Sequence, residues 1–328
     1  WTQDVCEELS LTKQILAISN HGTMLGGGEY SFLDFLSRLP NTWKPIALLP
    51  NEGELGARLR ENKIKTRIVP LPSIRPWFVH NILSCLRRYF IVCQENWPAL
   101  IYANGSRAAF YGGILGKLLN LPVIWHCRVA DKDPCLDFFL LRMTDCIVAN
   151  SHATARRFGS QWKYKVKVVH NGLDLEWLTD PSVEKPDFIS EHWKVAICVA
   201  RVSKWKRHDV VLDAFEKAAV HNPDAHLFFI GGKDAEKPEL WDYLQKRTEE
   251  SSCPDRIHWI GNVTDVRPWY RAAHLFVLGS ENEAFGRVVV EAMACGVPVV
   301  AARSGGVPEI VRDGQDGILV SQNNVICL

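Results

Sequence analysis

The stretch GSENEAFGRVVVEAMACGVPVVAARSGGVPEIV, residues 279–311, decides the fold of this chain. It reads as the end of a buried strand, a polar turn, an apolar helix that continues to Ala294, and a second strand that begins near Val299. Gly296 and Pro298 end the helix, because glycine adopts the left-handed conformation of a helix C-terminus and proline cannot continue a helix. This order of elements predicts a parallel strand–helix–strand unit.

The same alternation of short apolar runs and helical stretches extends over most of the chain. Continuous apolar runs are typical of strands in a parallel sheet that is covered on both faces. Helices are predicted between most strands, for example over Gly28–Leu39, Arg107–Leu119 and Asp209–Ala219. The predicted strands are Gln14–Ser19, Pro45–Leu49, Thr66–Pro70, Leu100–Ala103, Val123–His126, Cys146–Ala149, Lys167–His170, Val195–Val199, Leu227–Ile230, Ile257–Ile260, Leu275–Leu278 and Val299–Ala301.

Residues 174–193 interrupt this rhythm with prolines, many charges and no clear period, which predicts a linker. The sequence therefore predicts an α/β protein of two doubly wound, Rossmann-like, parallel-sheet domains, 1–173 and 194–328. We expect the two domains to face a cleft, because such sheets bind ligands beyond the carboxyl ends of their strands.

Composition and charge narrow the class of protein. The 328 residues are 47% hydrophobic and 23% charged, which excludes disordered and collagen-like classes. No apolar run is long enough to span a bilayer, and the polar residues 1–13 are unlike a signal peptide. The ten cysteines form no Cys-x-x-Cys pair, so a cytoplasmic protein is expected. The first half is basic and the second acidic, and their charges nearly cancel to a net charge of +1. Because the sequence has no dense patch of basic residues, no nucleic-acid partner is expected.

Three turns are candidate phosphate sites. Gly286 lies where a strand turns into a helix, and backbone N–H groups at the positive end of a helix favour an anion. The basic turn Arg201–Lys206 follows the first strand of the second half, and its cations suit a diphosphate. Gly26 and Gly27 precede the first helix, where glycine permits close approach of a phosphate. Solvated turns without a ligand are the alternative.

Two carboxylates lie near the turn of Gly286, one before the predicted helix and one within it. Glu283 precedes the turn, and Glu291 lies eight positions later, about two helical turns along. Glu283 can therefore face the cleft, while Glu291 can accept hydrogen bonds from the hydroxyls of a ligand. Gly305 and Gly306 are predicted to open a further helix nearby and to add N–H donors. A plain strand–helix unit with surface glutamates is the alternative.

Several other classes of site are disfavoured. No acidic residue ends the second predicted strand, which counts against a dinucleotide site, and Leu118 occupies the position where a P-loop needs Ser or Thr. Asp131 and Asp133 resemble an Asp-x-Asp metal motif, but we interpret this as a chance loop and predict no metal site. His126 ends a strand, where a functional role would need support from elsewhere.

The segment from Glu283 to Val300 resembles the hallmark motif of the GT4 family of retaining glycosyltransferases, which have the GT-B fold. Further segments are similar to other elements of that family, and the resemblance is strong from about residue 145 onward. It implies an enzyme that moves a sugar from a nucleotide-diphosphate-sugar to an acceptor hydroxyl of a glycan, a lipid-linked molecule or a small molecule. These further segments are Ser304–Val311, Asp313–Gly317, Asn171–Asp174 and Gly261–Val266.

The resemblance also implies roles for individual residues, with no cofactor and no metal. Arg201 and Lys206 match the cations that neutralise the diphosphate, Glu291 the residue that holds the ribose, and Glu283 a residue near the transferred sugar. His126 matches the family's active-site histidine. The implied catalytic residues are His126, Glu283, Arg201 and Lys206. The implied donor-binding residues are Gly26, Gly27, Arg201, Lys206, Val263, Phe285, Gly286, Arg287, Val288 and Glu291.

The chain departs from the family pattern at two places. Arg207 stands where the family commonly has a glycine after the lysine. Val325–Leu328 resembles the start of a helix that relatives continue, so we expect a family member that is truncated at its C-terminus. The alternatives are therefore a non-catalytic sugar-nucleotide-binding protein, inactive through this truncation, and a GT-B epimerase, which the glutamate pair disfavours.

Residues 76–97 form the last candidate element, a predicted helix with one apolar face. Apolar residues recur at helical spacing, and Arg87 and Arg88 lie among them. The first interpretation is a helix that packs on the sheet of the first domain. The second is a peripheral contact with the inner face of an anionic membrane, to which each basic residue would contribute about 1 kcal/mol. The apolar residues at helical spacing are Phe78, Ile82, Leu86 and Tyr89.

Overall fold

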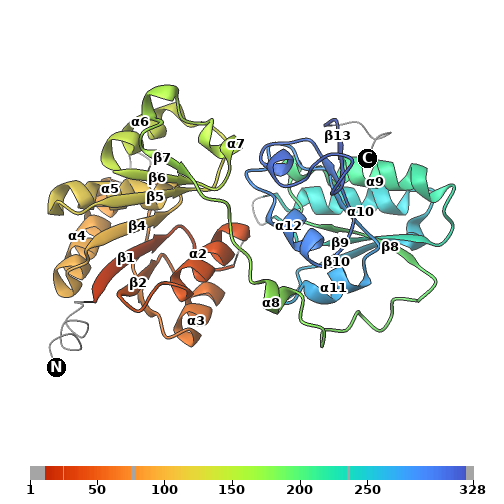
Figure 1. Ribbon diagram of the computed structural model, residues 1–328, viewed down its shortest axis with the longest axis horizontal. Coiled ribbons are helices and arrows are strands. Elements are labelled where there is room, and N and C mark those ends of the chain that lie inside the picture. The colour runs from red at the N-terminus through yellow and green to blue at the C-terminus, as the bar shows by residue number, and fades with distance from the viewer. Residues whose placement is uncertain (1–11, 25, 75–78, 235–236, 323–328) are drawn as a thin grey trace. The chain divides into compact units, whose positions relative to one another are not determined.

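The computed structural model describes residues 12–24, 26–74, 79–234 and 237–322. The chain divides into two compact units, residues 1–172 and 173–328 (Figure 1). Each unit contains one parallel sheet with helices on both faces, as the alternation of strands and helices predicts. The predicted fold class is therefore confirmed.

The first unit is built on a seven-stranded sheet in the order β3-β2-β1-β4-β5-β6-β7. Its strands are β1 (Lys13–Ser19), β2 (Trp43–Leu49), β3 (Lys65–Ile68), β4 (Leu100–Asn104), β5 (Val123–Cys127), β6 (Cys146–Ala149) and β7 (Val166–Val168). Its helices are α2 (Gly27–Ser37), α3 (Glu54–Glu61), α4 (Val79–Asn96), α5 (Ser106–Leu119), α6 (Pro134–Met143) and α7 (His152–Ala155).

The central strand β1 shows why this sheet is covered on both faces. Because successive side chains point to opposite faces of a strand, Ile15 and Ala17 pack on one side and Leu16 and Ile18 on the other. Helices α2 and α3 bury apolar side chains on the first side, and α4, α5 and α6 do so on the second (Figure 1). All four β1 side chains are buried, so the strand reads as a continuous apolar run.

The second unit repeats this plan with a six-stranded sheet in the order β10-β9-β8-β11-β12-β13. Its strands are β8 (Lys194–Val199), β9 (Ala225–Ile230), β10 (Ile257–Gly261), β11 (Leu275–Leu278), β12 (Val299–Ala302) and β13 (Ile318–Val320). Its helices are α8 (Leu175–Leu178), α9 (His208–Ala219), α10 (Glu239–Glu249), α11 (Arg267–Ala272) and α12 (Arg287–Ala294).

In both sheets the strand order reverses next to the first strand of the unit. The reversal lies between β1 and β4 in the first unit and between β8 and β11 in the second. In doubly wound sheets, ligands bind at this point, beyond the carboxyl ends of the strands. The turns that follow these strands are therefore where a site is expected in each unit.

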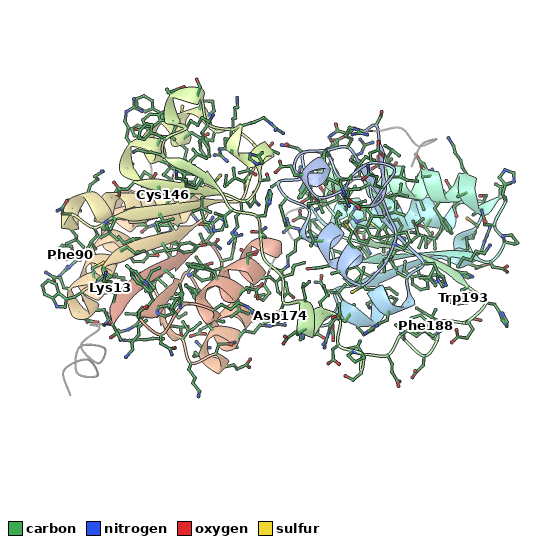
Figure 2. The ribbon with its side chains drawn as sticks, in the orientation of Figure 1. Lys13, Phe90, Cys146, Asp174, Phe188 and Trp193 are labelled. Carbon is green, nitrogen blue, oxygen red and sulfur yellow. The ribbon has the colours of Figure 1, made fainter. Side chains whose placement is uncertain are left out.

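The stretch expected to be a linker, 174–193, packs with the second unit. It contains α8, and Leu178 and Ile189 are buried in the core of that unit. Phe188 and Trp193 lie along the segment that leads into β8 (Figure 2). The Trp193 ring stacks on His226 with ring centroids 3.8 Å apart. These contacts are made by isolated aliphatic and aromatic side chains, which explains why the segment shows no period in its sequence.

Two further expectations can be compared with the fold. The predicted strands and the three helices named above are confirmed to within a few residues, whereas β13 was not predicted. The helix expected to open at Gly305 and Gly306 is only the short 3₁₀ turn Val307–Glu309. Val325–Leu328, residues 1–11 and the side chains of Trp77 and Phe78 lie outside the described residues. No helix in the described ranges is long and apolar enough to cross a membrane.

Candidate active site

Two turns that the sequence singled out meet at the strand reversal of the second sheet. Lys206 ends the short 3₁₀ turn Lys204–Lys206 after β8, and Glu283 lies in the turn after β11. Because β8 and β11 are neighbours, the Lys206 Nζ lies 2.6 Å from the Glu283 Oε2. Both side chains are largely buried, at 12% and 11% exposed. The structure thus joins a cation and a carboxylate that are 77 positions apart in the sequence.

The backbone around Glu283 is fixed by the loop that follows β12. The Glu283 N–H donates to Ser304 Oγ at 3.1 Å, and the Gly306 N–H donates to the Glu283 carbonyl at 2.7 Å. A Cβ at Gly305 would lie 1.9 Å from the Glu283 carbonyl oxygen, and its φ is +51°. The expectation that Gly306 adds a donor for a ligand is therefore wrong, because its N–H is already bonded to Glu283. These glycines position the carboxylate instead.

Arg207 adopts the left-handed conformation, with φ of +51°. This conformation suits glycine, since it costs other residues roughly 1–2 kcal/mol. The guanidinium pairs with Asp209 at 3.0 Å and also with Glu281. These two ion pairs offset the backbone cost and link the turn after β8 to the turn after β11.

Arg201 differs from Lys206 in its surroundings. Its side chain is 43% exposed, and its Nε lies 4.0 Å from Asp234. A loosely held, solvated guanidinium can turn toward an anion at little cost, and its planar fork suits phosphate oxygens. Arg201 and Lys206 therefore provide one mobile and one fixed cation beyond the end of β8.

Helix α12 begins beside Glu283 with a left-handed Gly286 at φ of +99°. Its N-cap residue is this glycine, which has no side chain to cap the first N–H groups. The buried Phe285 precedes this glycine, and Arg287 and Val288 form the first turn. The positive end of the helix is therefore available to an anion at the same strand reversal.

Glu291 lies about one turn into α12 and is held by two donors. Its Oε1 accepts from Arg287 Nε at 2.9 Å, and its Oε2 accepts from the Tyr270 hydroxyl at 3.0 Å. Burial and the neighbouring carboxylate raise the pKa of Tyr270 well above its usual range, so the phenol stays a donor. A carboxylate accepts about four hydrogen bonds. The Arg287 side chain thus orients Glu291, and the carboxylate keeps capacity for hydroxyls of a ligand.

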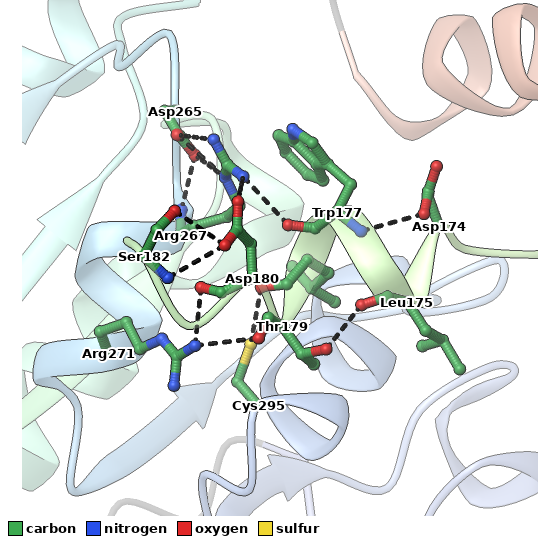
Figure 3. A network of polar contacts seen from close by, with 11 residues as sticks. Asp174, Leu175, Trp177, Thr179, Asp180, Ser182, Asp265, Arg267, Arg271 and Cys295 are labelled. Atoms are coloured by element: carbon green, nitrogen blue, oxygen red, sulfur yellow. Dashed lines mark hydrogen bonds and ion pairs between the residues drawn. The ribbon is translucent and has the colours of Figure 1, made fainter. Parts of the chain in front are cut away.

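The loop after β10 carries Val263 and is anchored to α8 (Figure 3). Arg267 binds the Asp265 carboxylate through Nε at 2.9 Å and a terminal nitrogen at 2.6 Å. The same guanidinium donates to the Trp177 carbonyl at 3.0 Å and lies 4.3 Å from the centre of its ring. Val263 packs against the core of the unit. The network holds the loop in place.

In the first unit, His126 lies near the end of β5. Its Nδ1 is 2.5 Å from the Tyr102 hydroxyl on the neighbouring strand β4 and 3.3 Å from an Arg128 guanidinium nitrogen. Burial, and then the charge of Arg128, hold the pKa of His126 well below its usual range. The imidazole is therefore neutral at physiological pH.

The glycine turn before α2 belongs to the same polar cluster. Arg128 donates to Asn104 Oδ1 at 2.7 Å and to Asn171 Oδ1 at 2.8 Å. Asn104 in turn donates to the Gly28 carbonyl at 3.4 Å, in the first turn of the helix that begins at Gly27. Gly26 is the N-cap residue and, as a glycine, has no side chain to cap the helix. The carboxyl ends of β4 and β5 and the start of α2 thus form one site within this unit.

The Asp-x-Asp segment has structural roles. Asp133 caps α6 by accepting a hydrogen bond from the Leu136 N–H at 3.1 Å. Four residues on, Asp137 forms a 2.5 Å ion pair with the buried Arg157. In the parts of the chain that the structure describes, no group of three or more His, Cys, Asp or Glu side chains could hold a metal ion.

Two family profiles match the chain. The profile of the family described as Glycosyltransferase Family 4 matches residues 25–177. The profile described as Glycosyl transferases group 1 matches residues 183–327. The chain belongs to glycosyltransferase family 4. The resemblance inferred from the sequence is thereby confirmed.

Curated relatives in family 4 resemble part of this chain. An N-acetyl-alpha-D-glucosaminyl L-malate synthase of Bacillus anthracis is 32% identical over 217 residues, covering 63% of this chain and 55% of the relative. A D-inositol 3-phosphate glycosyltransferase of Mycobacterium sp. (strain JLS) is 34% identical over 166 residues, covering 49% of this chain and 37% of the relative. The chain therefore spans about half or less of the length of these relatives.

Solved structures confirm the GT-B fold. HepE of Anabaena, in complex with UDP and glucose, has a TM-score of 0.81 at 22% identity and covers 95% of this chain and 87% of its own. A sucrose-phosphate synthase of Thermosynechococcus elongatus has a TM-score of 0.76 at 19% identity, with 96% and 88% covered.

The family 4 motifs do not reveal every residue that shapes the two sites. Tyr270 lies in α11 and Tyr102 in β4, each inside an element that reads as an ordinary buried segment. Ser304 supports Glu283 from a loop 21 positions away. One feature of the sequence could have led to Tyr102. His126 lies at a strand end, so polar residues on the neighbouring strands are candidates for contact with it.

Proposed function

We propose that this family 4 protein is a retaining glycosyltransferase that moves a sugar from a nucleotide-diphosphate-sugar to an acceptor hydroxyl. The observation that carries this proposal is the buried Lys206–Glu283 pair beside the glycine-led start of α12. A fixed ammonium and a helix end beside one carboxylate suit a ligand in which a diphosphate adjoins a polar, uncharged group. A nucleotide-diphosphate-sugar has this character.

In the proposed reaction, the bond between the anomeric carbon and the diphosphate oxygen breaks, and its electron pair stays on the diphosphate. Lys206, Arg201 and the α12 N-terminus are placed to stabilise the developing negative charge. The Lys206 ammonium has three N–H donors, of which Glu283 takes one, so two remain for phosphate oxygens. The acceptor oxygen attacks from the same face, and the leaving phosphate takes its proton, which retains the configuration.

The other predicted residues complete this proposal. Glu291 would accept from the ribose hydroxyls, and Val263 would contact the base through its backbone. Glu283 and the backbone of residues 285–288 would contact the sugar and its phosphate. His126 and the glycine turn of Gly26 and Gly27 would contribute from the first unit. The neutral imidazole and the glycine-led start of α2 support this assignment.

Thermal unfolding with a panel of nucleotide sugars tests the proposed donor. A ligand that binds the folded state at about 100 times its Kd stabilises it by about 2.7 kcal/mol. We expect one nucleotide sugar to raise the midpoint and to be transferred with retention, measured by NMR of the product's anomeric centre. Stabilisation without transfer or hydrolysis would instead indicate a sugar-nucleotide-binding protein. An unchanged midpoint with every donor would refute the proposal.

Transfer should not depend on a divalent metal ion. Lys206 and Arg201 supply the positive charge that a metal ion supplies in other transferases, and Asp133 is occupied as a helix cap. We expect excess EDTA to leave initial rates unchanged, measured by release of the nucleoside diphosphate. Full loss of activity that manganese or magnesium restores would overturn this prediction and return Asp131 and Asp133 to consideration as ligands.

We further propose a peripheral contact between α4 and an anionic membrane, which would suit a lipid-linked acceptor. The apolar face of α4 buries Cys85 and Tyr89 in the core. On the opposite face, Leu83 is 60% and Ile91 44% exposed, with the exposed Arg87 midway between them at a spacing of four residues. Exposed apolar and basic side chains in one stripe favour a membrane surface.

Sedimentation with lipid vesicles tests this contact. We expect binding to anionic but not to neutral vesicles, and release by salt. Arg87→Glu combined with Arg88→Glu should abolish binding. Lys132→Glu combined with Lys163→Glu, the same charge change at two other exposed positions of the first unit, should retain most of it. Equal loss in both double variants would mean that only the net charge matters, and no sedimentation at low salt would refute the contact.

A further inference from the structure

The imidazole of His126 meets two polar groups at a single nitrogen atom. Its Nδ1 lies 2.5 Å from the Tyr102 hydroxyl and 3.3 Å from an Arg128 guanidinium nitrogen. Tyr102 itself is held in place, because its ring stacks between Phe32 and Phe35 with centroids 6.1 and 4.5 Å away. Arg128 is held by Asn104 and Asn171. The surroundings of Nδ1 are therefore rigid.

Both of these neighbours are hydrogen-bond donors. A guanidinium has only N–H groups to offer and stays protonated in proteins. Burial raises the pKa of Tyr102, so its phenol keeps its proton. Because the guanidinium can only donate, Nδ1 is an acceptor and carries no proton, and the Tyr102 hydroxyl is then its second donor. The ring is neutral, so its single proton lies on Nε2.

The Nε2 atom is buried and has no hydrogen-bond partner within residues 12–24, 26–74, 79–234 and 237–322. Buried donors in folded proteins are nearly always satisfied, so an unpaired one indicates an acceptor that arrives from outside the chain. The N–H is fixed in direction by the two contacts at Nδ1. It lies in the polar cluster that also contains the start of α2.

We propose that Tyr102 and Arg128 are positioning residues that lock His126 as the Nε2–H tautomer, so that it donates a hydrogen bond to a substrate oxygen and does not act as a general base. The tautomer follows from the first unit alone, whereas the role toward substrate rests on the proposed function. In the proposed transfer, the acceptor's proton passes to the leaving phosphate, so the reaction needs no base at His126. The histidine orients or polarises an oxygen.

Nitrogen NMR of protein with 15N-labelled histidine, free of ligand, measures the tautomer directly. Wild-type protein should show His126 with a proton-bearing Nε2 and an unprotonated Nδ1, assigned by the loss of this signal in His126→Gln. Tyr102→Phe keeps the aromatic stack but removes one donor from Nδ1, and we expect a shifted or tautomer-averaged signal. Tyr164→Phe, at an exposed tyrosine of the same unit, should leave the signal unchanged. A proton on Nδ1 in wild-type protein would overturn the inference.

Activity separates a hydrogen-bond donor from a base. A glutamine amide can donate a hydrogen bond but cannot accept a proton, so His126→Gln should retain about tenfold more turnover than His126→Ala. Tyr102→Phe should lower kcat severalfold with KM little changed, and Tyr164→Phe should do neither. Equal loss in the glutamine and alanine variants would overturn the donor role. If the NMR result holds but wild-type protein transfers no sugar, the proposed function fails and the locked tautomer stands.

Discussion

Replacing Lys206 with alanine should lower turnover about 10²–10³-fold, the loss typical when a donor aimed at developing charge is removed. The ammonium is fixed by its 2.6 Å contact with Glu283, and it lies 4.0 Å from the centre of the Trp205 ring. A preoriented charge of this kind needs no reorganisation when the diphosphate leaves. Steady-state rates at saturating donor measure the effect. Lys217→Ala, at an exposed lysine of α9, is the matched control and should leave turnover unchanged.

The Lys206 variant also leaves the Glu283 carboxylate without its partner in a largely buried place. An unpaired buried charge can destabilise a protein by several kcal/mol, so thermal unfolding must be measured beside activity. Lys206→Ala combined with Glu283→Gln removes the stranded charge. If the loss of turnover came only from the unpaired charge, turnover would recover in the double variant. That result would refute the role of Lys206. We expect its stability to recover and its turnover to stay low.

The second large effect is expected on donor affinity. Glu291→Ala should weaken donor binding by roughly 1.5–3 kcal/mol, because ribose hydroxyls lose a charged acceptor. This corresponds to about 10- to 150-fold in Kd. Isothermal titration calorimetry with the donor found in the thermal screen measures it. Glu249→Ala, at an exposed glutamate of α10, should bind the donor like the wild type.

Two neighbours of Glu291 sharpen this test. Arg287 and Tyr270 hold the carboxylate at 2.9 and 3.0 Å, so Arg287→Ala and Tyr270→Phe should weaken binding in the same direction by less. Their effects should not add to that of Glu291→Ala, because all three residues act through one group. Unchanged affinity in Glu291→Ala would mean that the carboxylate only anchors Arg287 and Tyr270 within the fold.

Much of the fold could be predicted because its signals are local. The continuous apolar run of β1 and the sequence of residues 279–311 each indicate an element through neighbours a few positions apart. One segment that sequence reasoning handled poorly is also explained locally. Residues 174–193 pack through single anchors such as Leu178 and Trp193, which leave no period to detect.

By itself, the sequence determined the two Rossmann-like units, the positions of Lys206, Glu283 and His126 at the ends of elements, and the position of Glu291 within a helix. Such positions follow from periodicity and from turn residues, which depend on nearby chain. Only the tertiary structure decided which groups meet, because that depends on the order of strands in each sheet. The adjacency of β8 and β11 pairs Lys206 with Glu283 across 77 positions, and the adjacency of β4 and β5 brings the Tyr102 hydroxyl to His126 across 24. No local pattern encodes these pairings, because each depends on which strands the fold places side by side.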